Sequence, residues 1–336
     1  MKIDISEAEH LISIALQAKL VPMVHGSPAV GKSAVVKQVA KKFSLKVIDL
    51  RLSQCDPTDL MGFPSIKNDR AGYKPMDTFP IEGDTLPEGY QGWLLFLDEF
   101  NSAPRAVQAA AYKLVLDRMV GTHHLHKNVA IVCAGNLETD GAIVEEMSTA
   151  LQSRLVPLEV TISPKGWVKW AQTNGIDHRV TSYIEFRPDN VYMFSPEHSD
   201  KTYASPRTWE FVHKLLKVTE INKDTLPLLA GTIGEGVARE FYSFLQLQDK
   251  MPKIEQIITA PNTTAVPTEP SIQFALCGAI AANATAGNCA ALLDYVNRLP
   301  PEFQIVCVRG MLRRNPGIIK APSFGPWVSK VAAEVV

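Results

Sequence analysis

The stretch VPMVHGSPAVGKSAVVKQVAKKF, residues 21–43, has the pattern of a strand that enters a glycine-bounded loop and leaves it as a helix. Within it, Gly26, Gly31, Lys32 and Ser33 satisfy the spacing G-x-x-x-x-G-K-[ST]. Glycines there let the backbone curl, so that consecutive N–H groups and the positive end of the helix dipole face one point. The stretch therefore predicts a phosphate-binding loop in an α/β fold.

This loop is expected to hold a nucleotide with Mg²⁺. Lys32 is predicted to reach the β and γ phosphates, and Ser33 to place its hydroxyl on the metal. The predicted phosphate contacts come from Gly26, Ser27, Pro28, Ala29, Val30, Gly31, Lys32, Ser33 and Ala34. A glycine turn between strand and helix that binds no ligand is the alternative.

A second element of such a site is an acidic group at the end of a buried strand. GWLLFLDEFN, residues 92–101, supplies it, because four apolar residues precede Asp98 and Glu99. Asp98 is predicted to hold Mg²⁺ and Glu99 to polarise the attacking water, which favours hydrolysis over transfer to a hydroxyl acceptor. An acidic helix cap after a core strand is the simpler alternative.

A third apolar run, VAIVCAGN, ends in Asn136. An amide at the carboxyl end of a strand is suited to hold the same water or to contact the γ-phosphate. Asparagine is also common in turns, so a functional role for Asn136 is supported only in combination with the other two motifs.

Composition indicates an ordinary globular protein. Of 336 residues, 46% are apolar and 21% are charged, and the formal net charge is -1, so no global field favours nucleic acid or an anionic membrane as partner. The five cysteines are scattered without a Cys-x-x-Cys pair and are predicted to be reduced thiols of a cytoplasmic protein.

The first residues predict an amphipathic helix rather than a signal peptide, because charged side chains interrupt the apolar run. Ser6 and Glu9 have the spacing of a capping box. The predicted buried stripe consists of Leu11, Ile12, Ala15 and Leu16.

Taken in order, these motifs resemble those of the AAA+ ATPases, and within them the MoxR-like branch with its RavA, CbbQ, NorQ and GvpN types. The resemblance runs from about residue 5 to residue 216 and rests on GSPAVGKS, CDPTDLMGFP, GWLLFLDEFNSAPRAVQAAAYKLVLDR, VAIVCAGN, STALQSRLVPLEV and SPRTWEFV. One departure is Ala29-Val30, where the family usually has a loop that contains Pro-Gly.

The resemblance implies roles for three further side chains. Asn136 corresponds to the first sensor, and Arg154 to the arginine finger that reaches the γ-phosphate of a neighbouring subunit. Arg207 matches the second sensor, on the helical lid of the same subunit. Arginine suits both roles, since its planar charged fork matches phosphate. The rival finger candidates are Arg105 and Arg118.

The fold that the resemblance implies is a P-loop AAA+ module, a parallel sheet flanked by helices, with an all-helical lid and a helical C-terminal extension. The predicted boundaries are 1–160 for the nucleotide-binding domain, 161–257 for the lid, and 258–336 for a linker and a C-terminal bundle. Between residues 56 and 92, proline and glycine predict an inserted loop or hairpin. In MoxR-like proteins such an insertion lies near the pore of a ring, although a solvated loop is an equal alternative.

The resemblance thus implies a ring-forming Mg-ATP hydrolase, a hexamer that remodels or activates a protein client, often with a von Willebrand factor A domain partner, in a bacterium or one of its viruses. Three alternatives remain open at this point: a small-molecule P-loop kinase, a nucleic-acid motor or loader, and a nucleotide-binding switch without hydrolysis.

Overall fold

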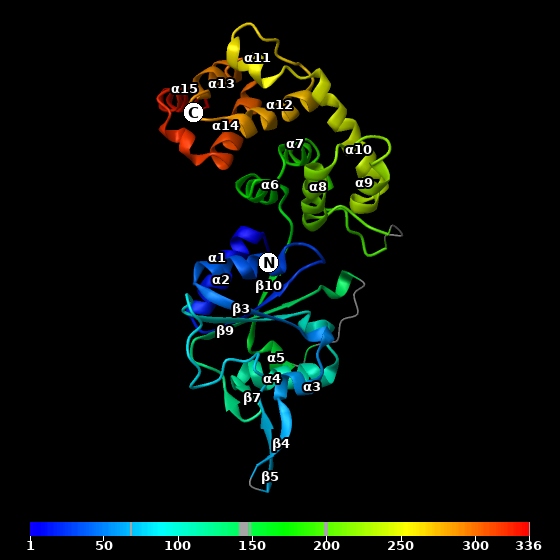
Figure 1. Cartoon of the computed structure of the whole chain (residues 1–336), viewed down its shortest axis with the longest axis vertical. Helices are drawn as coiled ribbons and strands as arrows, with labels where there is room; N and C mark the ends of the chain where they lie inside the picture. The colour runs from blue at the N-terminus through cyan, green and yellow to red at the C-terminus, as the bar shows by residue number, and fades with distance from the viewer. Residues whose placement is uncertain (68, 141–146, 148, 198–200, 336) are drawn as a thin grey trace. The chain divides into compact units, whose positions relative to one another are not determined.

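A computed structural model describes residues 1–67, 69–140, 147, 149–197 and 201–335. The chain forms two compact units (Figure 1). The first consists of Met1–Ile162 together with Ser195–Glu197, and the second begins at Ser163 and holds the remaining described residues.

The first unit is built on a sheet whose described strands all run parallel, in the order β1-β10-β2-β9-β6-β3. Helices flank this sheet, so the predicted α/β class is confirmed. The strands are β1 (Lys2–Ile3), β2 (Val21–His25), β3 (Leu45–Arg51), β6 (Gly92–Asp98), β9 (Val129–Gly135) and β10 (Leu155–Val160).

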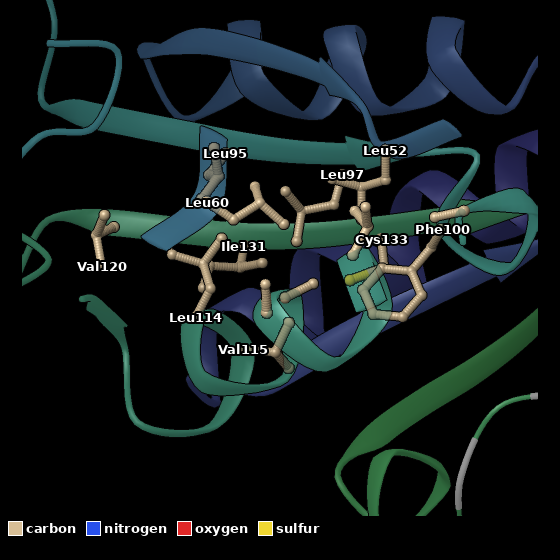
Figure 2. Packing of buried hydrophobic residues seen from close by; sticks show 14 of the residues in the cluster. Leu52, Leu60, Leu95, Leu97, Phe100, Leu114, Val115, Val120, Ile131 and Cys133 are labelled. Atoms are coloured by element: carbon tan, nitrogen blue, oxygen red, sulfur yellow. The ribbon is translucent and has the colours of Figure 1, made fainter. Parts of the chain in front are cut away.

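Helices cover both faces of the sheet because side chains of the central strands alternate between two apolar layers. Leu94 and Phe96 of β6 belong to the layer under α1 (Ile5–Gln17) and α2 (Lys32–Lys42). Leu95 and Leu97 face the opposite layer, which Figure 2 shows packed against Leu114 of α4. The helices on this second face are α3 (Pro57–Met61) and α4 (Arg105–Leu116).

Helix α1 starts earlier than predicted. Asp4 is its N-cap and accepts from the N–H groups of Ser6 and Glu7, while the Glu7 carboxylate accepts from the N–H of Asp4. The predicted Ser6–Glu9 box is therefore wrong by two residues. The predicted stripe also shifts, because Leu11 is 36% exposed and Ala8 is buried beside Ile12.

The inserted segment contains an antiparallel hairpin of β4 (Phe63–Lys67) and β5 (Arg70–Lys74). Its base is tight, since a Cβ at Gly62, where φ is 91°, would lie 2.5 Å from the carbonyl oxygen of Lys74. The shorter elements of this unit are η1 (Leu52–Gln54), η2 (Phe100–Ser102), β7 (Met119–Val120), β8 (His123–His124), η3 (Glu138–Asp140) and α5 (Thr149–Gln152).

In its described residues the second unit is all-helical, as predicted. Helix α12, almost completely buried, packs between α7 and α14. No helix in the described part of the chain has both the length and the apolar character needed to cross a bilayer. The helices are α6 (Pro164–Thr173), α7 (His178–Phe186), η4 (Pro188–Val191), α8 (Pro206–Val218), α9 (Leu226–Ile233), α10 (Glu235–Leu245), η5 (Gln246–Lys250), α11 (Ile254–Thr259), α12 (Pro270–Asn283), α13 (Cys289–Val296), α14 (Pro301–Arg314), η6 (Pro316–Lys320) and α15 (Phe324–Val335).

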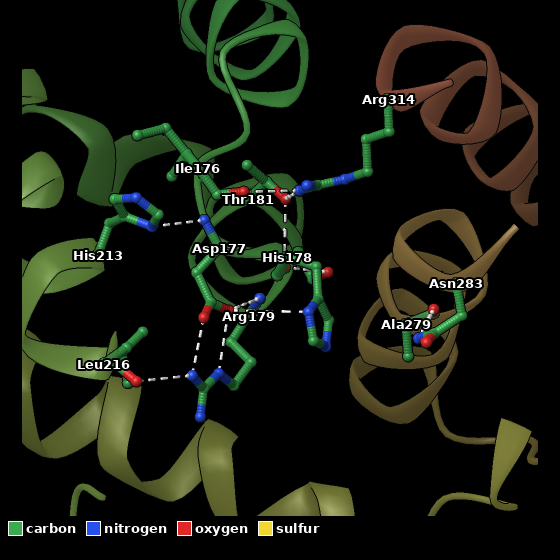
Figure 3. A network of polar contacts seen from close by, with 11 residues as sticks. Ile176, Asp177, His178, Arg179, Thr181, His213, Leu216, Ala279, Asn283 and Arg314 are labelled. Carbon is green, nitrogen blue, oxygen red and sulfur yellow. Dashed lines mark hydrogen bonds and ion pairs between the residues drawn. The ribbon is translucent and has the colours of Figure 1, made fainter. Parts of the chain in front are cut away.

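A polar network ties the helices of the second unit together (Figure 3). The carboxylate of Asp177, the N-cap of α7, is held by the guanidinium of Arg179 at 2.7 and 2.9 Å. The N–H of Asp177 donates to Nδ1 of His213 on α8. Arg314 of α14 donates to the carbonyl of Ile176 and to the Thr181 hydroxyl. Helices α7, α8 and α14 are therefore joined by buried and half-buried hydrogen bonds.

The segment predicted as a linker packs against the last bundle. Between α11 and α12 it has no regular structure, yet its carbonyl oxygens accept from side chains of the bundle. The Tyr295 hydroxyl donates to Ala265, and Arg298 donates to Pro261 and Thr264. A division of the second unit at residue 258 stays a prediction.

Candidate nucleotide-binding site

The glycine-bounded loop connects β2 to α2 and has the shape of an anion cradle. Its backbone turns twice through the left-handed region, at Ala29 with φ of 61° and at Gly31 with φ of 104°. Helix α2 begins at Lys32, and its N-cap, Gly31, makes no side-chain cap hydrogen bond. The first N–H groups of α2 and its positive dipole end therefore face the loop.

The Lys32 ammonium is buried inside this loop. It donates to the carbonyl oxygens of Gly26 at 2.5 Å and Ser27 at 3.1 Å, and to Oδ1 of Asn136 at 3.0 Å. The structure thus brings the predicted lysine of the loop into contact with the predicted sensor, 104 residues away in sequence.

The predicted metal ligands also meet. The Ser33 hydroxyl donates to Oδ2 of Asp98 at 3.1 Å, which joins the start of α2 to the end of β6. Burial raises the pKa of Asp98, and the N–H of Glu99, the Ser33 hydroxyl and the charge of Lys32 offset part of that effect. A cation beside Asp98 would favour its charged form, so the pair has the chemistry of a half-formed Mg²⁺ site.

Glu99 is held in an unusual conformation. Its backbone is left-handed, with φ of 55°, which costs free energy in a residue other than glycine. Its side chain accepts a hydrogen bond from the hydroxyl of Ser53 in η1, and its N–H donates to Oδ1 of Asp98 at 2.9 Å. The two acidic side chains are therefore separately anchored.

Asn136 is fixed from the opposite side by a reciprocal pair of hydrogen bonds. Asn101 donates to the carbonyl of Asn136 at 2.8 Å and accepts from its N–H at 3.1 Å. The contact requires glycine before Asn136, because a Cβ at Gly135 would lie 2.2 Å from Oδ1 of Asn101. The Asn136 amide is thereby left to face Lys32.

Strand order explains why residues so distant in sequence converge. β9, which ends at Asn136, lies between β2, which feeds the loop, and β6, which ends at Asp98. Because parallel strands end at one edge, the three motifs meet there, outside the carboxyl ends of the strands. Every predicted phosphate, metal and catalytic residue of the first unit except Arg154 belongs to this edge.

The polar groups at this edge fit a nucleoside triphosphate with Mg²⁺. An uncapped helix start, a left-handed loop and a buried ammonium suit phosphate oxygens. One hydroxyl and one carboxylate are few protein ligands, but Mg²⁺ commonly keeps several waters and phosphate oxygens beside one or two protein groups. Ser33 and Asp98 would hold the ion, which would supply charge neutralisation between the phosphates.

The arginine candidates occupy different settings. Arg154 lies between α5 and β10, is exposed, and donates to the Ser153 hydroxyl at 3.2 Å. Arg118, a rival finger, donates to the carbonyl of Val129 at the start of β9, and burial lowers its pKa. Arg105 is the first residue of α4. Arg118 thus contacts its own chain, and which arginine acts as a finger stays a prediction.

Arg207 belongs to the second unit. It is the second residue of α8, after Pro206, and Ser205 is the N-cap, whose hydroxyl accepts from the N–H of Thr208 at 3.3 Å. The predicted helix start is therefore confirmed, while a role for Arg207 at the phosphates stays a prediction.

Sequence reasoning missed three residues of this edge. Ser53 and Asn101 hold the two predicted polar residues in place, as described above. His25, the last residue of β2, has its pKa lowered by burial and by the charge of Lys32. Ser53 follows the end of β3. A search for polar residues just after each predicted strand would therefore have found it.

Comparisons with known proteins find only distant similarity to solved structures. No protein-family model matches the sequence, and no curated protein sequence matches it either. RuvB of Thermotoga maritima, a Holliday junction branch migration motor, is 13% identical over 76% of this chain and 74% of its own, with a TM-score of 0.36. NtrX of Brucella abortus, solved with ADP, is 13% identical over 98% of this chain and 68% of its own, also at 0.36. The function must therefore be argued from the site itself.

Proposed function

We propose that the protein is an Mg-ATP hydrolase. One observation carries the proposal: the lysine and serine of the loop contact Asn136 at 3.0 Å and Asp98 at 3.1 Å. A glycine turn that binds nothing has no need of a buried ammonium aimed at a neutral amide, or of a hydroxyl aimed at a buried carboxylate.

Each residue of the edge has a distinct task. Lys32 neutralises phosphate charge, and the N–H groups of the loop and α2 orient the phosphate oxygens. Glu99 accepts a proton from, or orients, the attacking water, while Asn136 positions that water or the γ-phosphate. Bound Mg²⁺ supplies electrostatic stabilisation to the transferring phosphoryl group. The chemistry is mainly positioning and charge stabilisation.

We further propose a MoxR-like AAA+ ring, supported by the order of motifs in the sequence. In it Arg154 reaches the γ-phosphate of the next subunit, and Arg207 acts within its own subunit. The exposed position of Arg154 on the surface of the first unit is consistent with a role in trans. Hexameric assembly, cytoplasmic location, a remodelled protein client and a von Willebrand factor A domain partner belong to the same proposal.

Hydrolysis is favoured over transfer by the arrangement of the carboxylates. Glu99 is anchored by Ser53 independently of Asp98, so the site has one carboxylate for the metal and a second for water. A kinase that phosphorylates small hydroxyl acceptors needs the metal-binding carboxylate but no second carboxylate to orient a water molecule.

Glu99→Gln tests the proposal. The amide keeps the size of the side chain and cannot act as a base, so the variant should bind Mg-ATP and turn it over at least about 100-fold more slowly. Light scattering with and without Mg-ATP should show a nucleotide-dependent shift to roughly six subunits.

Glu138→Gln is the matched control, because Glu138 is an exposed carboxylate close in sequence to Asn136. It should retain wild-type turnover. Unchanged turnover in Glu99→Gln would overturn hydrolysis at this edge, and a monomer in both conditions would overturn the trans role of Arg154.

A further inference from the structure

The β4–β5 hairpin projects from the rest of the first unit (Figure 1) and exposes both of its faces. Residues paired across an antiparallel hairpin share a face. One face is uncharged and consists of Pro64, Ile66, Ala71 and Tyr73. The other carries Phe63 with Arg70 and Lys74. Ile66 is 82% exposed and Phe63 is 63% exposed, so large apolar side chains stand in water on both faces.

This exposure needs an explanation. A two-stranded hairpin is marginally stable in water without a packed face, and exposed apolar patches on a hairpin commonly mark an interaction site. Residues 63–74, here termed the basic hairpin, contain three cations and one anion, a net charge of +2. The surface is therefore suited to a partner that is both apolar and acidic.

A surface of that chemistry lies in the same unit. Residues 81–91, IEGDTLPEGYQ, here termed the acidic loop, contain Glu82, Asp84 and Glu88 and no cation, a net charge of -3. Leu86 and Tyr90, in the same loop, are 46% and 45% exposed.

The acidic loop is also held in shape by its own hydrogen bonds. The N–H of Glu82 donates to His124 at 2.9 Å, the N–H of Gln91 donates to Ser44 at 2.8 Å, and the Asp84 carboxylate accepts from the N–H of Ile81 at 2.7 Å. A preordered loop loses less conformational entropy on binding. Glu82 and Glu88 are exposed and so remain available to a partner.

We propose that the basic hairpin of one copy of this chain docks on the acidic loop of a second copy. The two surfaces are different, so the contact is head-to-tail, and a head-to-tail contact generates a ring if its rotation closes. Opposite net charge steers the encounter, and Phe63 and Ile66 against Leu86 and Tyr90 supply apolar area.

Among the side chains that the structure describes, no ion pair joins the basic hairpin to the acidic loop of the same copy. The ion pairs among the described residues of this unit are Lys2–Glu159, Lys37–Asp49 and Lys42–Glu9. A second copy of the chain is thus a partner that carries the acidic and apolar surface that the basic hairpin requires. The inference rests on the proposed ring, to which it assigns a contact.

Charge reversal tests the contact. Arg70→Glu with Lys74→Glu, and separately Glu82→Lys with Glu88→Lys, should each weaken nucleotide-dependent assembly of the full chain at least about 10-fold, measured by sedimentation velocity. The variant with all four changes restores the wild-type net charge and should recover assembly. Lys41→Glu with Lys46→Glu, two exposed cations elsewhere on the unit, is the control and should assemble normally.

Failure of this contact is distinguishable from failure of the proposed function. If the wild type assembles and hydrolyses ATP while either reversal pair leaves assembly unchanged, or the fourfold variant fails to recover, the docking inference is overturned and the hydrolase stands. If the wild type does not assemble under any condition, the proposed ring is contradicted. A reversal pair that assembles normally but no longer binds an acidic, apolar model peptide would assign the hairpin to a client instead.

Discussion

At the scale of single residues, the site depends on side chains that anchor other side chains. Ser53 donates to the Glu99 carboxylate, and Asn101 grips the backbone of Asn136 at both of its polar groups. Both therefore act by positioning a polar residue of the site. Glu99 needs such support because its left-handed backbone is strained.

Removing one of these anchors gives the first prediction. The Ser53 hydroxyl donates to one oxygen of the Glu99 carboxylate and so holds that side chain in one position. Ser53→Ala should therefore lower basal ATP turnover, by about 5-fold for one hydrogen bond of about 1 kcal/mol, at unchanged KM. Steady-state ATPase kinetics measure it.

Ser102→Ala, which removes a hydroxyl from the loop after Glu99, is the control for Ser53→Ala and should leave turnover within a factor of two of wild type, about the scale of a neutral surface change. A Ser53→Ala enzyme as fast as wild type, or faster, would contradict the prediction and show that Glu99 does not need this anchor for turnover.

The sequence predicts Lys32, Ser33, Asp98 and Asn136 because each belongs to a local motif with its own physical requirement. Their contacts in the structure confirm that they share one place. Ser53 and Asn101 cannot be predicted in this way, because they belong to no local motif. Their importance depends on which strand lies next to which, and that order follows from packing of the whole sheet rather than from any short segment.

At the scale of elements, strand and helix positions follow from apolar patterning, while helix ends depend on competition between similar caps. Asp4 and Glu7 offer the same box geometry as Ser6 and Glu9, and both pairs precede the same apolar run. The helix that starts at Ile5 buries Ala8 and Ile12 in the layer that packs on the sheet. Tertiary packing thus decides between two caps that the sequence leaves equal.

Capping energetics give the second prediction. Asp4→Ala removes the acceptor for two backbone N–H groups and should lower the free energy of unfolding by about 1 kcal/mol. Ser6→Ala, which removes no N-cap acceptor, should change it by less than about 0.5 kcal/mol. Urea unfolding followed by circular dichroism compares the two, and equal losses, or a larger loss for Ser6→Ala, would contradict the observed cap.

The inserted segment illustrates the limit of composition. Its prolines and glycines exclude a long helix, yet they do not say that residues 63–74 form a hairpin or that its faces differ in charge. Those properties depend on strand register, and a shift by one residue would exchange the two faces. The linker prediction has the same limit, since packing against Tyr295 and Arg298 has no local signal.

At the scale of the whole molecule, the first unit contains the loop and the residues to which we assign metal binding and water orientation in the proposed hydrolase. The proposed finger, Arg154, is exposed on the surface of this unit. An arginine that completes a neighbour's site couples hydrolysis to assembly, which is the property that a ring needs in order to act as a unit.

Mixing two inactive variants tests this coupling. Arg154→Ala keeps the intact loop and Glu99, and Glu99→Gln keeps the intact finger, so each alone should be at least about 100-fold slower than wild type. In equimolar mixed rings, a site is complete where the first protein supplies the nucleotide side and the second supplies the arginine. Random assembly places such pairs at roughly a quarter of the interfaces, so mixing should restore about that share of wild-type turnover.

The recovery should vanish on dilution below the concentration at which the rings dissociate, because each complete site needs two chains. Arg105→Ala mixed in the same way separates Arg105 from Arg154 as the finger: its own turnover should stay near wild type if Arg154 is the finger. A mixture no faster than its components would mean that Arg154 acts within its own chain or not at all, and ATP turnover would then be a property of the single subunit.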